Sequence, residues 1–150
     1  MTETLVCFSY GSNMSTAYLL ETCPGAEPIM RAELANHRIE FRRFSTDLRG
    51  GLSTIMAAPG EIVPGVLFQV PRAEIEALDL LEDVDKGLYR RETHLVLGSD
   101  DAWHAAELYR VAQPRGPFTP SPRYVGWMID GAREHGLGEA YIETLKRLLA

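Results

Sequence analysis

The sequence is poor in cysteine and shows no metal-binding pattern. Its two cysteines, Cys7 and Cys23, form no Cys-x-x-Cys pair, and Cys7 lies in an apolar run, where a buried free thiol is the usual state. The four histidines show no His-Glu-x-x-His spacing and have no cysteine partners. We therefore expect a protein of a reducing compartment with no metal site.

Long apolar runs and concentrated positive charge are missing as well. No apolar segment approaches the roughly 20 residues of a membrane span. The first residues lack the basic flank and apolar core of a signal peptide. The formal net charge is −6, whereas a nucleic-acid-binding face needs clustered cations. These absences predict a cytoplasmic protein that binds neither membrane nor nucleic acid.

One group of arginines does occur between positions 31 and 49, but acidic residues separate its members. This alternation favours a solvated face and leaves a binding role as the weaker alternative. The arginines are Arg31, Arg38, Arg42, Arg43 and Arg49.

The signatures of several common enzyme chemistries are also absent. The chain has no G-x-G-x-x-G sequence and no Walker loop. Ser12 lies in S-Y-G-S-N, which lacks the second glycine of the G-x-S-x-G nucleophile elbow. Dinucleotide binding, P-loop chemistry and elbow-type serine hydrolysis are therefore not indicated.

What is present is an ordinary globular composition, 45% hydrophobic and 24% charged, which predicts one domain over residues 1–150. β-forming runs predict strands at about 4–9, 28–45 (in two pieces broken near Asn36), 52–57, 62–70, 89–97 and 103–111. Cap residues, proline and glycine predict helices after Ser15 or Asn13, over 71–83, over 122–135 and through 141–149. Because the helices do not alternate strictly with the strands, we expect an α+β fold with a curved or closed, mostly antiparallel sheet.

The first predicted strand ends at Tyr10-Gly11-Ser12-Asn13, the Y-G-S-N turn, directly before a helical pattern. Such a crossover directs several backbone N–H groups into one small space, where a carboxylate or a developing oxyanion is stabilised. Glycine suits a positive φ or the close approach of a ligand. Taken alone, however, a tight capped turn without a binding role is the simpler interpretation of so short a motif.

The predicted helix 71–83 carries an acid on its apolar face. Ile75, Leu78 and Leu81 form an apolar stripe at helical spacing, and Glu82 follows Leu78 by four residues on the same face. The other acids of this part of the helix are expected to face solvent: Glu76, Asp79 and Asp83. An apolar setting and a helix C-terminus both raise the pKa of a carboxyl, which is then suited to proton transfer near neutral pH.

The alternative for Glu82 is a side chain turned outward or paired with Arg90 or Arg91. Two tyrosines, Tyr89 and Tyr124, each follow a turn or a proline cluster and are candidates for a pocket, although packing with the hydroxyl at the surface is the commoner role. Trp103 and Trp127 are expected in the core.

Five motifs, taken together and in this order, resemble the γ-glutamylcyclotransferase family. They are F-x-Y-G-S-N at 8–13, G-G-L-S-T-I at 50–55, P-G-E-x-V-x-G-V at 59–66, L-D-x-x-E-x-V-x-x-G-x-Y at 78–89, and P-S-P-R-Y at 120–124 with G-A-R-E-H-G-L at 131–137. The resemblance implies a small mixed, mostly antiparallel β-barrel flanked by helices.

The resemblance also implies an activity and its residues. The α-amine of an L-γ-glutamyl amino acid or peptide attacks its own γ-carbonyl, which releases 5-oxoproline and a free amino acid without cofactor, metal or water. The family's catalytic glutamate falls on Glu82, which acts as base and then as acid. The implied substrate-binding residues are Phe8, Ser9, Tyr10, Gly11, Ser12, Asn13, Tyr89 and Tyr124.

Two departures from the family pattern bear on this expectation. Asp83 stands where a glycine is common, and it raises the pKa of Glu82 further if it faces the site. Residues 22–50 match weakly and are expected to shape the side of the pocket that faces the leaving group. Two alternative functions therefore stay open: cyclisation of a γ-glutamyl amine or γ-glutamyl-protected metabolite, and non-catalytic binding of a γ-glutamyl ligand. The sequence also leaves a homodimer open.

Overall fold

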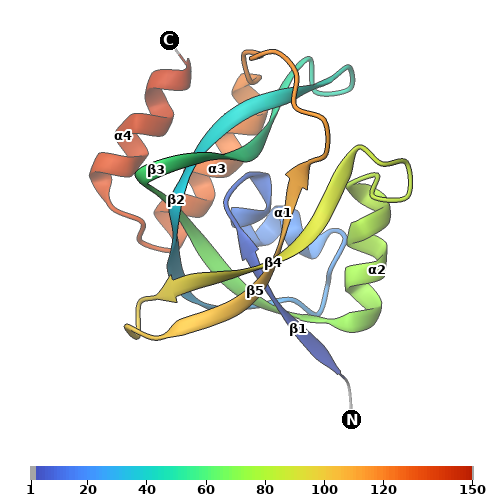
Figure 1. The fold of residues 1–150 in the computed structure, drawn as a ribbon, viewed down its shortest axis with the longest axis vertical. Coiled ribbons are helices and arrows are strands. Elements are labelled where there is room, and N and C mark those ends of the chain that lie inside the picture. The colour runs from blue at the N-terminus through green and yellow to red at the C-terminus, as the bar shows by residue number, and fades with distance from the viewer. Residues whose placement is uncertain (1–2, 150) are drawn as a thin grey trace.

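The computed structural model describes residues 3–149, and its strands form a closed barrel in the order β1-β3-β2-β4-β5 (Figure 1). Their bounds are β1 (Thr4–Ser9), β2 (Glu27–Ser45), β3 (Gly50–Pro71), β4 (Tyr89–Gly98) and β5 (Trp103–Val111). β1 pairs in parallel with β5, whereas the other neighbouring strands are antiparallel. The expected mixed, mostly antiparallel barrel flanked by helices is confirmed.

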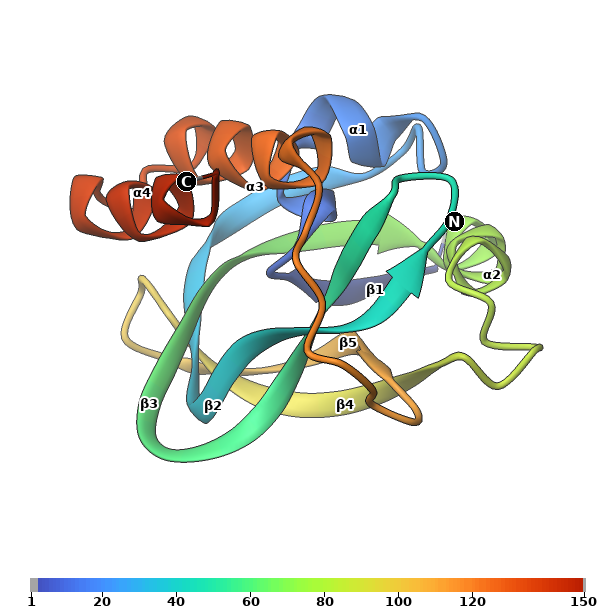
Figure 2. The ribbon, with the colours of Figure 1, turned by 90° about the horizontal axis from the view of Figure 1, so that it is seen from above.

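The helices gather mainly on one side of this barrel. They are η1 (Ser12–Met14), α1 (Thr16–Leu20), α2 (Arg72–Leu81), α3 (Pro122–Glu134), α4 (Glu139–Lys146) and η2 (Arg147–Leu149). Figure 2 shows α1, α3 and α4 along one side, with α2 apart from them. Within residues 3–149, no helix combines the length and the apolar character needed to cross a membrane.

The predicted helix caps are confirmed. The Ser15 hydroxyl accepts the Tyr18 N–H at the start of α1, and the Ser121 hydroxyl accepts the Tyr124 N–H at the start of α3. Such bonds satisfy N–H groups that have no partner within the helix. The second cap matters for function, because it fixes the helical turn that carries Tyr124.

Two predicted breaks are bends inside long strands. β2 continues through Asn36, which has a φ of 62°, and β3 continues through Gly60, which has a φ of 85°. The Gly60 N–H donates to Asn36 Oδ1 at 3.0 Å, and the pairing register shifts there. The local turn signals are therefore real, but they bend a continuous hairpin around the barrel instead of ending its strands.

The predicted helix 71–83 is shorter than expected at both ends. Pro71 closes β3 and caps α2 instead of opening its first turn, and Glu82 is the C-cap after Leu81. Ile75 and Leu78 are buried as predicted, but Leu81 is 50% exposed. The core prediction for Trp103 is also wrong, because this side chain is 60% exposed on β5.

The buried residues form two clusters, and β1, β2 and β3 each contribute residues to both. One cluster draws on all five strands, with Phe8, Leu34, Ile55, Val96 and Leu108, and therefore fills the barrel interior. The other packs the helices against the outside of the barrel. There, Gly131 of α3 lies so close to η1 that a Cβ would be 2.4 Å from the Cβ of Met14. Because no side chain separates them, α3 directly supports the segment that follows the Y-G-S-N turn.

Candidate active site

The Y-G-S-N turn connects β1 to η1 and presents unused donors. Two backbone bonds of 3.1 Å close it, from the Met14 N–H to the Gly11 carbonyl and from the Ser15 N–H to the Ser12 carbonyl. Within residues 3–149, the N–H groups of Gly11, Ser12 and Asn13 donate to no protein acceptor. Such a row of N–H groups can bind a carboxylate or an oxyanion.

Glycine at position 11 is required by packing, not by backbone conformation. Its φ is −107°, so a positive φ, one of the two reasons considered for glycine in this turn, does not apply. A Cβ on Gly11 would lie 2.4 Å from Ser53 Oγ and 2.8 Å from Tyr124 Oη. The turn therefore rests directly against two polar side chains, and its position depends on them.

One cavity brings together all the residues that the sequence singled out. The cavity is small, with room of about 50 Å³ at its centre. Its walls include the predicted residues Phe8, Ser9, Tyr10, Gly11, Ser12, Asn13, Glu82, Tyr89 and Tyr124. Five further residues line it that the sequence analysis did not name as site residues: Cys7, Ser53, Leu78, Glu107 and Tyr109.

Ser53 holds the two predicted pocket tyrosines. Tyr124 Oη lies 2.8 Å from Ser53 Oγ and accepts the Ser53 N–H at 3.3 Å, while Tyr89 Oη donates to the Ser53 carbonyl at 3.2 Å. Both rings are buried, and burial raises the pKa of each phenol above its ordinary value, so both stay neutral. Ser53 lies within the G-G-L-S-T-I motif, and this motif is the sequence feature from which a place for Ser53 in the site could have been predicted.

Glu82 faces this cavity from the end of α2. The residue is partly exposed, but its carboxyl is enclosed enough that burial raises its pKa to about 7. The charge of Arg43 and a hydrogen bond from Asn13 lower the pKa, whereas the charge of Asp83 raises it. Asn13 Nδ2 donates to Glu82 Oε1 at 3.5 Å. Both protonation states of Glu82 are therefore populated near neutral pH.

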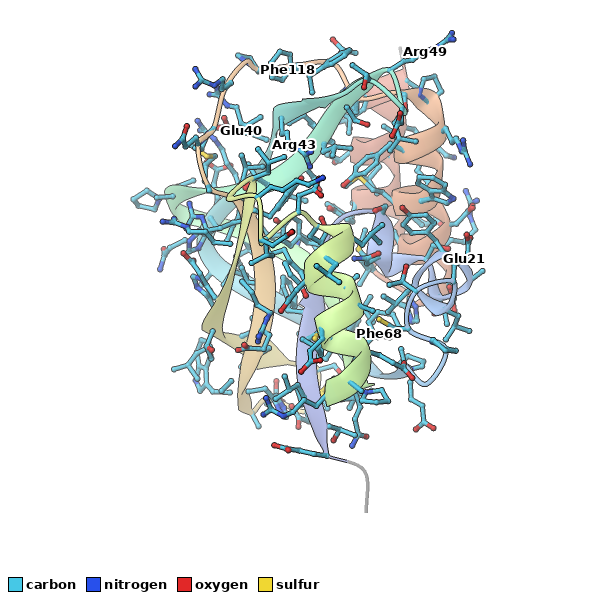
Figure 3. All side chains as sticks on the ribbon, turned by 90° about the vertical axis from the view of Figure 1, so that its right-hand side faces the viewer. Glu21, Glu40, Arg43, Arg49, Phe68 and Phe118 are labelled. Atoms are coloured by element: carbon cyan, nitrogen blue, oxygen red, sulfur yellow. The ribbon has the colours of Figure 1, made fainter. Side chains whose placement is uncertain are left out.

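Arg43 and Asp83 form a charged pair beside Glu82, and neither behaves as the sequence suggested. Arg43 Nη2 lies 3.1 Å from Asp83 Oδ2, and both side chains are 24% exposed instead of fully solvated. The Arg43 guanidinium also lies over the Tyr89 ring, 5.4 Å from its centroid. Figure 3 shows Arg43 on β2 above the end of α2. The alternative pairing of Glu82 is not found, since Arg90 pairs with Glu92 and Arg91 with Asp79 and Glu107.

A polar network ties α2 to the barrel below the cavity. Asp79 Oδ1 accepts hydrogen bonds from Tyr109 Oη at 2.6 Å and from Arg91 Nε at 3.0 Å. Tyr10 Oη donates to the Tyr109 carbonyl, and Arg91 also binds Glu107. The solvent-facing prediction for Asp79 is therefore wrong, because β4 and β5 cover that side of the helix. The network fixes α2, and with it Glu82.

The cavity also contains a thiol, but its chemistry is not that of a nucleophile. Burial raises the pKa of Cys7 to about 12, so the thiol stays protonated at neutral pH. In the described part of the chain, no three His, Cys, Asp or Glu side chains are grouped to hold a metal ion. What the cavity offers is a carboxyl of near-neutral pKa opposite a row of N–H donors, an arrangement suited to acid–base chemistry.

Comparison with known proteins agrees with this architecture. Residues 62–145 match the AIG2-like family. A γ-glutamylcyclotransferase of Mus musculus is 30% identical over 150 residues, which cover 97% of this chain and 79% of the relative. The Homo sapiens γ-glutamylcyclotransferase is 29% identical with the same coverage. A solved structure of a γ-glutamyl cyclotransferase superposes with a TM-score of 0.91 at 28% identity, over 96% of this chain and 87% of that one. The chain therefore belongs to the AIG2-like family and is an enzyme of the γ-glutamylcyclotransferase type.

Proposed function

We propose that this protein converts L-γ-glutamyl amino acids or peptides into 5-oxoproline and the free amino acid or peptide, with Glu82 as the base and then the acid. The observation that carries the proposal is the position of Glu82. It lines the same cavity as the Y-G-S-N turn, and its pKa of about 7 lets it accept and return a proton at neutral pH.

The reaction begins at the α-ammonium group of the γ-glutamyl substrate. This group loses a proton to Glu82, and the free amine nitrogen then attacks the γ-carbonyl carbon. The C–N bond to the leaving group breaks as the leaving nitrogen is protonated by Glu82. Over the whole reaction, two protons leave the attacking nitrogen and two reach the leaving nitrogen. No water is consumed, and no external acid is needed.

The Y-G-S-N turn supplies the second part of the chemistry. Its free N–H groups are placed to bind the negatively charged oxygens of the γ-glutamyl group and of the tetrahedral intermediate. Removing one donor from an oxyanion site typically costs about 10²–10³ in rate. The hydrogen bonds that join Tyr89, Ser53 and Tyr124 hold these buried side chains in fixed positions beside the turn. A fixed pocket of this kind favours the folded substrate conformer that cyclisation requires.

The proposal is tested by measuring 5-oxoproline release from γ-glutamyl-alanine, glutathione and a γ-glutamyl amine. Glu82→Gln removes the proton acceptor but keeps the size and shape of the side chain, so we expect no detectable turnover with any of them. Glu76→Gln is the matched control, because Glu76 is an exposed acid on the same helix. Its rate should equal that of the wild type.

The three substrates also separate the alternatives. Turnover of the amine alone would favour the γ-glutamyl-amine or protected-metabolite reaction. Binding of the substrates without 5-oxoproline release would favour a non-catalytic domain. Near-normal turnover by the Glu82→Gln variant would refute the role assigned to Glu82.

A further inference from the structure

A second cavity meets the first at Glu82. It shares Ser12, Glu82, Tyr89 and Tyr124 with the first cavity. Its outer wall comes from the β2–β3 hairpin, the start of β3 and the start of α3, with Ser45, Asp47, Leu48, Leu52, Arg123 and Trp127. Because the scissile bond must lie at Glu82, a γ-glutamyl group in the first cavity directs the leaving group into the second.

Two cations line this second cavity, and they differ in how they are engaged. Arg43 already binds Asp83, whose second oxygen lies 3.6 Å from Lys86. Arg123, by contrast, forms no ion pair and no side-chain hydrogen bond within residues 3–149. Its guanidinium carbon lies 5.1 Å from the centre of the Trp127 ring, which stacks on Tyr18 at 4.1 Å. The aromatic pair therefore orients the guanidinium while its N–H groups stay free.

The position of Arg123 in its helix is unfavourable for an unpaired cation. It is the second residue of α3, where the helix dipole favours negative charge. A free guanidinium at a cavity wall matches the geometry of a carboxylate, which it can bind through two parallel N–H bonds. Three acids line this cavity, and within residues 3–149 none of them pairs with Arg123: Asp47 comes from the β2–β3 turn, Asp83 is held by Arg43, and Glu82 is hydrogen-bonded to Asn13.

We propose that Arg123 binds the α-carboxylate of the leaving amino acid, which makes the second cavity a specificity site for γ-glutamyl amino acids over γ-glutamyl amines. The inference rests on the proposed cyclisation reaction and names the leaving-group half of that site. Leu48, Leu52 and Leu81 line the same cavity, so it accommodates an apolar side chain on the leaving amino acid. Ser45, Asp47 and Leu48 of this cavity belong to the segment 22–50, for which the sequence predicts a place facing the leaving group.

The test compares two substrates that differ only in the charge of the leaving group, γ-glutamyl-leucine and γ-glutamyl-leucinamide. Initial rates of 5-oxoproline release give kcat/KM for the wild type and for Arg123→Gln. We expect the wild type to prefer the carboxylate substrate by about tenfold, the scale of one charge-assisted contact at a partly open site. Arg123→Gln should lose about that factor on γ-glutamyl-leucine, chiefly through KM, so that the ratio between the substrates falls close to one.

Arg133→Gln is the matched control, since Arg133 is an exposed arginine at the opposite end of α3. It makes the same charge change, and it should leave the substrate ratio at the wild-type value. Arg123→Lys keeps the charge without the planar fork and should recover part of the preference. Circular dichroism spectra of all variants should coincide with that of the wild type.

A wild-type ratio near one, or an equal loss on both substrates in Arg123→Gln, would overturn the role of Arg123. Absence of 5-oxoproline from both substrates would contradict the proposed reaction instead. In that case calorimetry still tests the subsite, because the wild type should bind γ-glutamyl-leucine more tightly than the amide, and Arg123→Gln should bind both equally. Equal affinities in the wild type would overturn the inference.

Discussion

The two cavities that meet at Glu82 hold their polar groups in different ways. In the first, Ser53 is hydrogen-bonded to the buried Tyr89 and Tyr124, and Gly11 of the Y-G-S-N turn packs against Ser53 and Tyr124, so these groups have little freedom to move. In the second, Arg123 lies at the surface and is oriented by an aromatic ring alone. From this difference we infer that the rigid first cavity holds the groups that carry out the reaction, and that the more open second cavity selects the leaving group.

The largest expected effect comes from disturbing the rigid side. Gly11→Ala places a methyl group 2.4 Å from Ser53 Oγ, so the turn and the hydrogen-bonded side chains of Ser53 and Tyr124 cannot all keep their positions. We expect kcat/KM for γ-glutamyl-alanine to fall by about a hundredfold or more, because the N–H donors lose their alignment. Steady-state kinetics on the folded variant measure this.

Gly60→Ala is a useful comparison for that experiment. A Cβ there meets nothing within 4 Å, although its φ of 85° adds local strain far from the cavity. This variant should lose some stability and keep its kcat/KM. A Gly11→Ala enzyme with wild-type kinetics would show that the turn can move away from Ser53 without loss of activity, which contradicts a rigid first cavity.

The second effect concerns stability. Burial raises the pKa of Glu82 from 4.5 to about 7, so the folded protein binds more protons than the unfolded chain between these values. The free energy of unfolding therefore falls as the pH rises through this window. A difference of about 2.5 pKa units corresponds to about 3 kcal/mol at pH 8.

Glu82→Gln removes this cost, since an amide does not ionise. Urea unfolding should show the variant more stable than the wild type by up to about 3 kcal/mol at pH 8, with the difference disappearing near pH 4. Glu76→Gln should show no such pH-dependent gain. A Glu82→Gln variant that is less stable than the wild type at pH 8 would mean that the ionised carboxyl is well solvated in the folded protein.

The parts of this site that could be predicted are those that depend on residues close together in the sequence. The Y-G-S-N turn, the Ser121 cap and the position of Glu82 on an apolar stripe follow from local patterns, and they could be predicted. The roles of Ser53 and Arg43 could not be predicted, although Ser53 lies in the G-G-L-S-T-I motif, because these roles arise from the register of the long β2–β3 hairpin. That register brings Ser53 to Tyr124 and Arg43 to the end of α2.

The helix projection failed for Asp79 and Leu81 for a related reason. An ideal helical wheel assumes that one face is buried and the opposite face is solvated. β4 and β5 approach α2 from the side, where Arg91 and Tyr109 bind Asp79, while Leu81 at the last turn is half exposed and lines the second cavity. The location of neighbouring strands, which the wheel does not include, decides both exposures.

The smallest effect concerns the charged pair at the border between the two cavities. The charge of Arg43 lowers the pKa of Glu82, and the charge of Asp83 raises it. Removing the Arg43 charge should therefore raise the pKa of Glu82, and removing the Asp83 charge should lower it. Arg43→Gln should shift the acidic limb of kcat/KM to higher pH, and Asp83→Asn to lower pH, each by up to about one unit for partly screened charges. Asparagine is suitable at position 83 because the residue has a φ of 55°. Shifts in the same direction would show that the pair acts through structure and not through charge.

The most direct test of the account is the pH dependence of kcat/KM in the wild-type enzyme, measured with γ-glutamyl-alanine between pH 5 and 9. Since Glu82 must be ionised to accept the first proton, activity should rise with pH and level off with an apparent pKa of about 7. A titration of the Glu82 carboxyl carbon by NMR should give the same value. An activity limb near pH 4.5, the ordinary value for glutamate, would contradict the claim that burial tunes this carboxyl for proton transfer at neutral pH.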